Sequence, residues 1–266
     1  MKRLLTIGLI PLVLGAVGAV LRAYELAFRF NPITGLPENA IAATPMLIAL
    51  CVLMAAAAAF FAFRNRRPSP SEVKSAPAFT IAAALAFGAM LGLFAFLLMN
   101  RVQESAALHY MLAAFTLLAA VSIAITGIKH LHALDNGMYA FIAVLPVFWA
   151  CFSLILVFRD RIADPIIADY IYLLFALISI LVFTYAHAGY IYSKNRFAVA
   201  AISAMMGTFF CVIELVSPFI ARMVNAAYVM PQINFSLALP LAVFAVYMPF
   251  AAVQMLKNEN GIVAKR

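Results

Sequence analysis

Eight separate runs of about 20 mostly apolar residues constrain the fold of this chain more than any other feature. The hydrocarbon core of a bilayer is about 30 Å thick, and an α-helix of about 20 apolar residues crosses it. Helices also satisfy their backbone polar groups internally, as lipid requires. The sequence therefore predicts an all-α, polytopic transmembrane helical bundle of about eight spans. The runs cover approximately residues 4–22, 44–63, 78–99, 108–127, 138–158, 166–190, 197–220 and 233–255.

The composition agrees with a membrane protein and excludes several other classes. Apolar residues (A, V, I, L, M, F, W, Y and C) make up 67% of the chain and D, E, K and R make up 11%, against roughly 45–50% and about 25% in soluble globular domains. This excludes a secreted disulfide scaffold, a disordered chain, a nucleic-acid-binding domain and a conventional soluble enzyme. We expect one integral membrane domain over residues 1–266, with no soluble domain.

The basic residues indicate the orientation, because cytoplasmic loops carry an excess of Lys and Arg. With the N-terminus in the cytoplasm, 12 of the 18 basic residues, including every lysine, fall on the cytoplasmic side. We therefore predict that both termini are cytoplasmic. The basic linker 64–77 is expected to contact anionic lipid headgroups. The first run also fits a signal peptide cleaved near Ala19, but it continues into Arg22 and Glu25 without a clear mature start, so we favour an uncleaved helix.

Small residues and prolines indicate how the helices pack. Small side chains allow the close helix contacts that hold membrane bundles together. They occur at Gly8, Gly15 and Gly18 in the first run, and as a GxxxG spacing at Gly88 and Gly92 in the third. We expect both sets to make contacts within one molecule. Prolines at positions 11, 146, 240 and 249 lie inside apolar runs, where each is expected to kink its helix and leave a carbonyl for a neighbour or for water.

Two acidic residues lie within or next to apolar runs, where a charge is expensive and marks a candidate site. Asp169 follows Asp164 and Pro165, which are typical of a helix start, so it is expected one turn into its helix, near the interface. Glu214 lies 18 residues after Arg196, or about 27 Å along a helix, in the outer part of the membrane. A structural ion pair and a ligand-binding acid are both open for Glu214.

The basic partners expected for Glu214 lie at the same predicted depth. They are Arg22, Arg29, Arg101 and Arg222. Arg22, Glu25 and Arg29 also share a face if the first helix continues outward. We therefore predict a mixed-charge cluster in the outer half of the bundle, which is a candidate ligand site or ion-pair network. Its members are Arg22, Glu25, Arg101, Asp169, Glu214 and Arg222.

No catalytic, cofactor or metal signature occurs in the sequence. It contains no HExxH, GxSxG, P-loop or dinucleotide glycine motif. His130 and His132 diverge on a helix and have no third ligand nearby. The three cysteines lie in apolar runs and predict no disulfide. We expect no catalytic residue, no cofactor and no metal site; the missing motifs weigh against an enzyme, and that class stays open.

One segment resembles uncharacterised bacterial multi-pass membrane proteins. The resemblance rests on the sequence RDRIADP at 159–165, DYIY at 169–172 and AGY at 188–190. It implies a multi-pass protein of the bacterial cytoplasmic membrane and transfers no activity or site residue.

Three classes of function stay open. A non-catalytic partner, sensor or assembly subunit fits the short loops and the absence of catalytic motifs, and we rank it first. A small-solute or ion-coupled transporter with an outward-facing polar site fits the outer acids and the proline-containing helices. An intramembrane enzyme comes third. The partners expected are the lipid bilayer and either another membrane protein or a small solute, and no nucleic acid.

Overall fold

The computed structural model describes residues 5–29, 42–65, 77–99, 106–128, 136–161, 167–191, 196–225 and 235–263. These ranges form a π-helical turn and eight α-helices, and all eight are long and apolar enough to cross a membrane. The prediction of an all-α bundle of eight spans is confirmed, and the chain is a multi-pass membrane protein. The elements are η1 (Leu5–Leu9), α2 (Ile10–Phe28), α3 (Ala43–Arg64), α4 (Pro77–Met99), α5 (Ala106–Gly127), α6 (Asn136–Arg161), α7 (Ile167–Ile191), α8 (Phe197–Val224) and α9 (Phe235–Val263).

The observed helix ends differ from the predicted ends mainly in the first and last spans. Helix α2 continues six residues beyond Arg22, because Glu25 pairs with both Arg22 and Arg29 and the paired charges do not stop the helix. Helix α9 continues to Val263, past the apolar window Leu237–Leu256. The spans from α3 to α8 end within four residues of the predicted limits.

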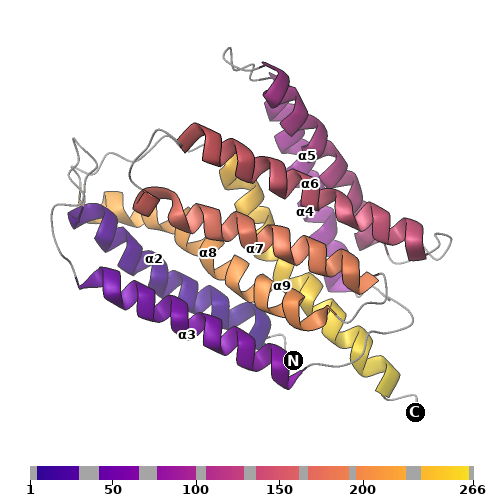
Figure 1. Cartoon of the computed structure of the whole chain (residues 1–266), viewed down its shortest axis with the longest axis horizontal. Helices are drawn as coiled ribbons and strands as arrows, with labels where there is room; N and C mark the ends of the chain where they lie inside the picture. The colour runs from indigo at the N-terminus through magenta and orange to yellow at the C-terminus, as the bar shows by residue number, and fades with distance from the viewer. Residues whose placement is uncertain are drawn as a thin grey trace.

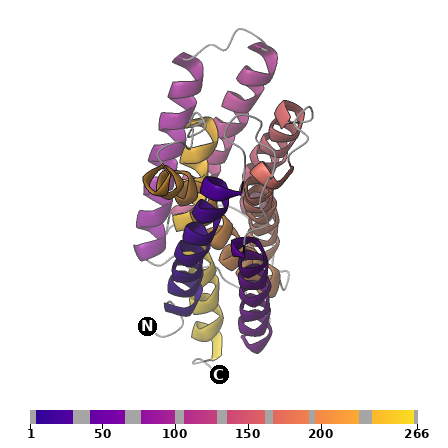
Figure 2. The ribbon, with the colours of Figure 1, turned by 90° about the vertical axis from the view of Figure 1, so that its left-hand side faces the viewer.

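Six helices pack in a ring in the order of the sequence. Each helix from α4 to α9 packs against the next, and α4 closes the ring by packing against α9. Helices α2 and α3 pack against each other and against the outer side of α8 (Figure 1). The pair α4 and α5 stands apart from α2 and α3, on the far side of the molecule (Figure 2). Helix α8 is therefore central, because it contacts α2, α3, α7 and α9.

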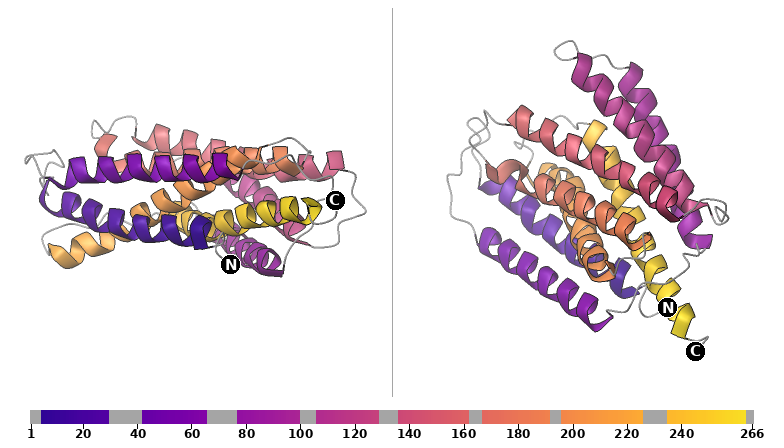
Figure 3. Two further views of the ribbon diagram at one scale, coloured as in Figure 1. Left: turned by 90° about the horizontal axis from the view of Figure 1, so that it is seen from below. Right: turned by 45° about the vertical axis from the view of Figure 1, so that its right-hand side comes forward.

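The beginning of η1 and the end of α9 lie at the same end of the bundle (Figure 3). This agrees with an even number of crossings, as the distribution of lysines predicted. We call this end the terminal end, and we call the opposite end, where α2 ends and α3 begins, the distal end. The assignment of the terminal end to the cytoplasm stays a prediction.

The glycines of α2 lie where two helices approach most closely. A Cβ atom added at Gly15 would lie 3.0 Å from Val212 Cβ and 3.2 Å from the Phe209 carbonyl oxygen, both on α8. A Cβ atom at Gly18 would lie 2.7 Å from Ile213 Cδ1. The prediction that these small residues make close contacts within the molecule is confirmed, since only a glycine lets α2 lie this near to α8.

The GxxxG pair of α4 behaves differently. Gly88 and Gly92 are exposed, and a Cβ atom added at either would meet nothing within 4 Å in the part of the chain that the structure describes. The prediction of contacts within the molecule is wrong for this pair. The spacing puts both glycines on one face, but it does not say which face of α4 turns inward.

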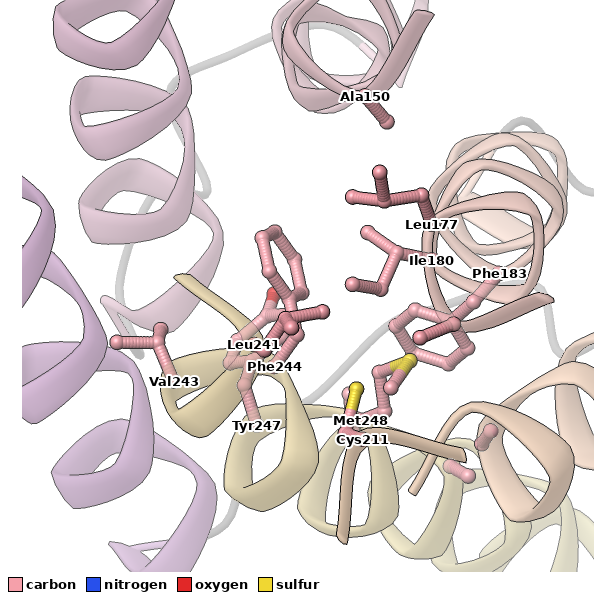
Figure 4. Packing of buried hydrophobic residues seen from close by; sticks show 14 of the residues in the cluster. Ala150, Leu177, Ile180, Phe183, Cys211, Leu241, Val243, Phe244, Tyr247 and Met248 are labelled. Atoms are coloured by element: carbon pink, nitrogen blue, oxygen red, sulfur yellow. The ribbon is translucent and has the colours of Figure 1, made fainter. Parts of the chain in front are cut away.

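Aromatic and aliphatic side chains fill the inside of the ring. Trp149 of α6 stacks on Phe244 of α9, with 5.5 Å between the ring centroids. Phe183 of α7 and Phe244 each make an edge contact with Tyr247. Figure 4 shows Ala150 of α6, Ile180 of α7 and Phe244 of α9 directed toward one another from three sides. The main apolar core is therefore inside the ring, where α6, α7 and α9 face one another.

At two prolines inside helices, a hydroxyl group of a neighbouring helix donates a hydrogen bond to the carbonyl that the proline leaves free. Pro146 cannot donate to the carbonyl of Ile142, and Ser122 Oγ of α5 donates to that oxygen at 2.7 Å. Pro249 likewise leaves the carbonyl of Ala245 free, and Thr208 Oγ1 of α8 donates to it at 3.3 Å. The prediction that a neighbour satisfies the freed carbonyl is confirmed at both prolines.

Candidate functional site

The last turns of α2 carry three charged residues on one face. Arg22 and Glu25 are three positions apart, and Arg29 follows Glu25 by four, so all three lie on the same side of the helix. A buried carboxylate in a membrane costs several kcal/mol unless opposite charges and hydrogen-bond donors surround it. The spacing supplies an arginine one turn before Glu25 and another one turn after it.

Glu25 accepts hydrogen bonds from three side chains. Arg22 Nη1 donates to Oε2 at 2.7 Å, and both side chains are only 3% exposed. Thr44 Oγ1, in the first turn of α3, donates to Oε1 at 2.8 Å. Arg29 Nη1 also donates to Oε1, and it lies 3.1 Å from Thr44 Oγ1. Both carboxylate oxygens are thus occupied by groups of the same chain, two of them charged donors, which make the strongest hydrogen bonds.

The charged group also reaches α7. The guanidinium carbon of Arg22 lies 5.0 Å from the centre of the Tyr172 ring, which is cation–π geometry. Arg22, Glu25, Arg29, Thr44 and Tyr172 therefore join α2, α3 and α7 at the distal end, and we call them the Glu25 cluster. The cluster carries one more positive than negative charge, and Arg29, at 25% exposure, is its most exposed arginine.

Helix α8 is fastened to the same end of α2. Asn225, which follows α8, donates from Nδ2 to the carbonyl of Ala27 at 2.7 Å, and its backbone N–H bonds the carbonyl of Ala221. Ala23, Leu26, Ala27 and Ala221 form a small buried apolar cluster between the two helices. The distal ends of α2, α3, α7 and α8 are therefore all linked through the last turns of α2.

The structure places the other predicted site residues as follows. Glu214 is half-buried on α8 and adjoins the buried stripe of Ser203, Gly207 and Cys211. Arg222 is exposed, two turns further along α8. The site prediction as a whole stays a prediction, because the side chain of Asp169, at the third position of α7, and all of Arg101 lie outside the described residues.

Of the six predicted residues, Arg22 and Glu25 are in direct contact. Arg22 and Arg29, which the sequence offered as partners of Glu214, both bond to Glu25. The partner of Glu214 stays a prediction. Sequence reasoning did not find Thr44 or Tyr172. Thr44 is the first residue of its predicted apolar run, and no pattern in the sequence marks Tyr172 as a neighbour of the first helix. Their contacts with α2 depend on how the helices pack, which no local pattern in the chain indicates.

Metal-binding and nucleophilic groups are scattered in the described structure. Within the described ranges no three His, Cys, Asp or Glu side chains are grouped closely enough to hold a metal ion. His187 is buried, and its ring stacks on Phe183 at 5.8 Å and lies edge-on to Tyr247 and Phe79. Cys51, Cys151 and Cys211 are free thiols. His130 and His132 lie outside the described residues.

Two polar atoms inside the ring have no hydrogen-bond partner among the described residues. They are Trp149 Nε1 and Ser153 Oγ, one turn apart on α6, and both side chains are almost completely buried. Most other buried hydroxyls bond to a backbone carbonyl. Ser122 and Thr208 bond neighbouring helices, and Thr116, Thr126, Ser179, Thr184 and Ser203 bond their own helix.

The chain was compared with protein families, curated proteins and solved structures. No family model, curated protein or solved structure matches it. Its class as a multi-pass membrane protein therefore rests on its eight apolar helices. The comparisons identify no family, so the resemblance to bacterial multi-pass membrane proteins stays a prediction.

Proposed function

We propose that this chain is a non-catalytic membrane protein that acts through another membrane protein, as an assembly or sensor subunit. The observation that carries the proposal is that the Glu25 carboxylate is fully hydrogen-bonded within the chain. Both of its carboxylate oxygens are bonded to Arg22, Arg29 and Thr44 of the same chain. A transport site needs an acid that exchanges its partners for a solute or ion, whereas Glu25 holds α2 to α3 and, through Arg22, to α7.

The inside of the ring supports the same proposal. The described residues that face it are mostly aromatic and aliphatic, and most buried hydroxyls there are engaged by backbone carbonyls. A polar solute crossing this region would have to replace its hydration with such groups, which is costly. The described interior therefore favours a packed structural core over a hydrophilic route.

A small-solute transporter is the second candidate, and one observation favours it. Trp149 Nε1 and Ser153 Oγ are buried in the core without a partner in the described structure. Buried polar groups are almost always bonded, so an unbonded pair suggests a site that a bound molecule completes. In this alternative, α6 would carry the binding groups, and Glu214 would lie on a water-accessible face of α8.

Cysteine labelling separates the two functions. The background is a protein in which Cys51, Cys151 and Cys211 are replaced by Ala. Glu214→Cys is then compared with Arg222→Cys, which lies eight residues further along α8 at an exposed position. Intact cells are treated with a membrane-impermeant maleimide. A sealed subunit predicts labelling of the Arg222 variant alone.

Labelling at both positions would show an aqueous route to Glu214 and would overturn the proposed function in favour of transport. Ala221→Cys adds a depth-matched control, because Ala221 is fully buried between α2 and α8 and adjoins exposed Arg222. A partner role further predicts that site-specific photo-cross-linking from one of the exposed helix faces, sampled at Val52 on α3 and Ile155 on α6, gives one adduct of defined mass in native membranes. Adducts with lipid alone would count against it.

A further inference from the structure

An apolar groove lies at the terminal end of the bundle, between the first turns of the chain and α9. Its volume is about 380 Å³, within the range of small-molecule sites, and every residue that lines it is apolar. All of these residues fall inside the membrane-spanning windows of their helices. The lining includes Gly8, Leu9 and Leu12 on one side and Ala245, Pro249 and Val253 on the other.

Two local features keep this groove open and apolar. Gly8 has no side chain, and a Cβ atom there would approach Pro249 Cβ to 4.0 Å, so a larger residue at position 8 would fill the space. Pro249 leaves the Ala245 carbonyl free, but Thr208 of α8 donates to it. The backbone acceptor that Pro249 frees is thus used by α8. The groove needs no polar occupant, and an apolar chain fits it.

The rim of the groove faces the lipid. Leu9 is 52% exposed and Val246 53% exposed, although both lie within membrane-spanning segments. An acyl chain from the surrounding leaflet can therefore enter from the side. Lys257 follows Val253 by one helical turn of α9 and lies just past the apolar window that ends at Leu256. A lysine at this level attracts an anionic headgroup.

We propose that this groove binds one acyl chain of an anionic phospholipid from the leaflet at the terminal end, with Lys257 selecting the headgroup. The apolar wall accounts for the acyl chain, and the lysine one turn beyond the groove accounts for the charge of the lipid. The proposal is independent of the partner role proposed above.

Tryptophan quenching by brominated lipids tests the proposal. Trp149 is the only tryptophan of the chain, so Trp149→Phe gives a silent background. Leu12→Trp then reports on the groove. Leu85→Trp on α4 is the control, because Leu85 lies on an open lipid-facing surface. The two positions have a similar depth: Leu12 lies about 10 Å from the start of η1, and Leu85 lies about 12 Å from the start of α4. Each variant is placed in phosphatidylcholine vesicles with a small fraction of brominated phosphatidylglycerol, or of brominated phosphatidylcholine as the zwitterionic comparison.

The expected result is a preference for phosphatidylglycerol of about fivefold at position 12 and none at position 85. Gly8→Leu should remove this preference at position 12 by filling the groove, while lipid at the exposed rim still quenches the indole. Gly88→Leu is its matched control, because Gly88 is exposed and has nothing within 4 Å in the described structure. Lys257→Gln should abolish the preference and leave quenching by phosphatidylcholine intact.

Three results would overturn the proposal. Equal quenching curves at positions 12 and 85 would mean that only ordinary surrounding lipid touches the groove. A preference that survives Gly8→Leu would place the anionic lipid elsewhere. Protection of position 12 from both brominated lipids, with normal quenching at position 85, would show that protein covers the groove, either a second copy or an end of this chain.

Discussion

Replacing Glu25 with Gln tests whether the Glu25 cluster holds the helices together. The substitution keeps the size of the side chain and removes its charge, which leaves Arg22 buried at 3% exposure without its carboxylate. Removing one partner of a buried ion pair costs about 3–5 kcal/mol, because the other charge is left uncompensated. We expect Glu25→Gln to lower the free energy of unfolding by about 3 kcal/mol or more.

Substitutions at the other members of the cluster give losses in the free energy of unfolding to which the loss for Glu25→Gln can be compared. Arg29 is 25% exposed, so Arg29→Gln should cost less than about 1 kcal/mol, as at partly solvated pairs. Thr44→Val removes one hydrogen bond and should cost about 1 kcal/mol. The double variant Arg22→Met, Glu25→Gln leaves neither charge buried, so its loss should fall short of the sum of the single losses by about 1–3 kcal/mol.

The assay is reversible unfolding in bicelles, with the free energy measured for each variant under the same conditions. Equal losses for Glu25→Gln and Arg29→Gln would refute the reasoning, because they would mean that water solvates the carboxylate in place of Arg22. A double variant that shows the full sum of the two losses would also contradict it, since the two residues would then act independently.

Two further predictions use the same assay. Ser122→Ala leaves the carbonyl of Ile142 without its donor and should lower the free energy of unfolding by about 1–3 kcal/mol. Ser153→Ala should cost little, because Ser153 Oγ makes no hydrogen bond to the described residues. Equal losses would contradict the idea that Ser122 satisfies the carbonyl freed by Pro146. Gly15→Ala brings a methyl group against the backbone of α8 and should lower the free energy of unfolding by about 1–3 kcal/mol. Gly92→Ala, on the exposed face of α4, should change it by less than about 0.5 kcal/mol. A Gly92 variant as unstable as the Gly15 variant would contradict the close contact of α2 with α8.

The membrane spans could be predicted from the sequence because lipid imposes both their length and their composition. The length of an apolar run predicts the end of a helix poorly when the residues after the run carry charges that pair with one another. Helix α2 passes Arg22 and ends at Phe28 for that reason. The inward face of a helix was also hard to predict. Gly15 and Gly88 occur in similar small-residue patterns, but among the described residues Gly15 meets another helix and Gly88 does not.

The candidate site was predictable only where its members lie on one helix. The spacing of Arg22, Glu25 and Arg29 placed them on one face of α2, and in the structure Glu25 bonds to both arginines. Thr44 and Tyr172 belong to α3 and α7, and their approach to α2 follows from packing between segments far apart in the sequence. Depth in the membrane grouped Glu214 with the outer arginines, but depth alone does not specify which of them is nearest.

The proposed function depends most directly on a packed core without an aqueous route, and the native protein carries a probe for it. Trp149 is the only tryptophan, is fully buried and stacks on Phe244 inside the ring. In sealed vesicles, the account predicts emission typical of a dry indole and no quenching by iodide added on either side. Trp149→Phe, Met223→Trp, with the probe at a site 85% exposed, provides the control for an accessible indole. Quenching of Trp149 by iodide in the folded protein would contradict the account and would support a transport route through the ring.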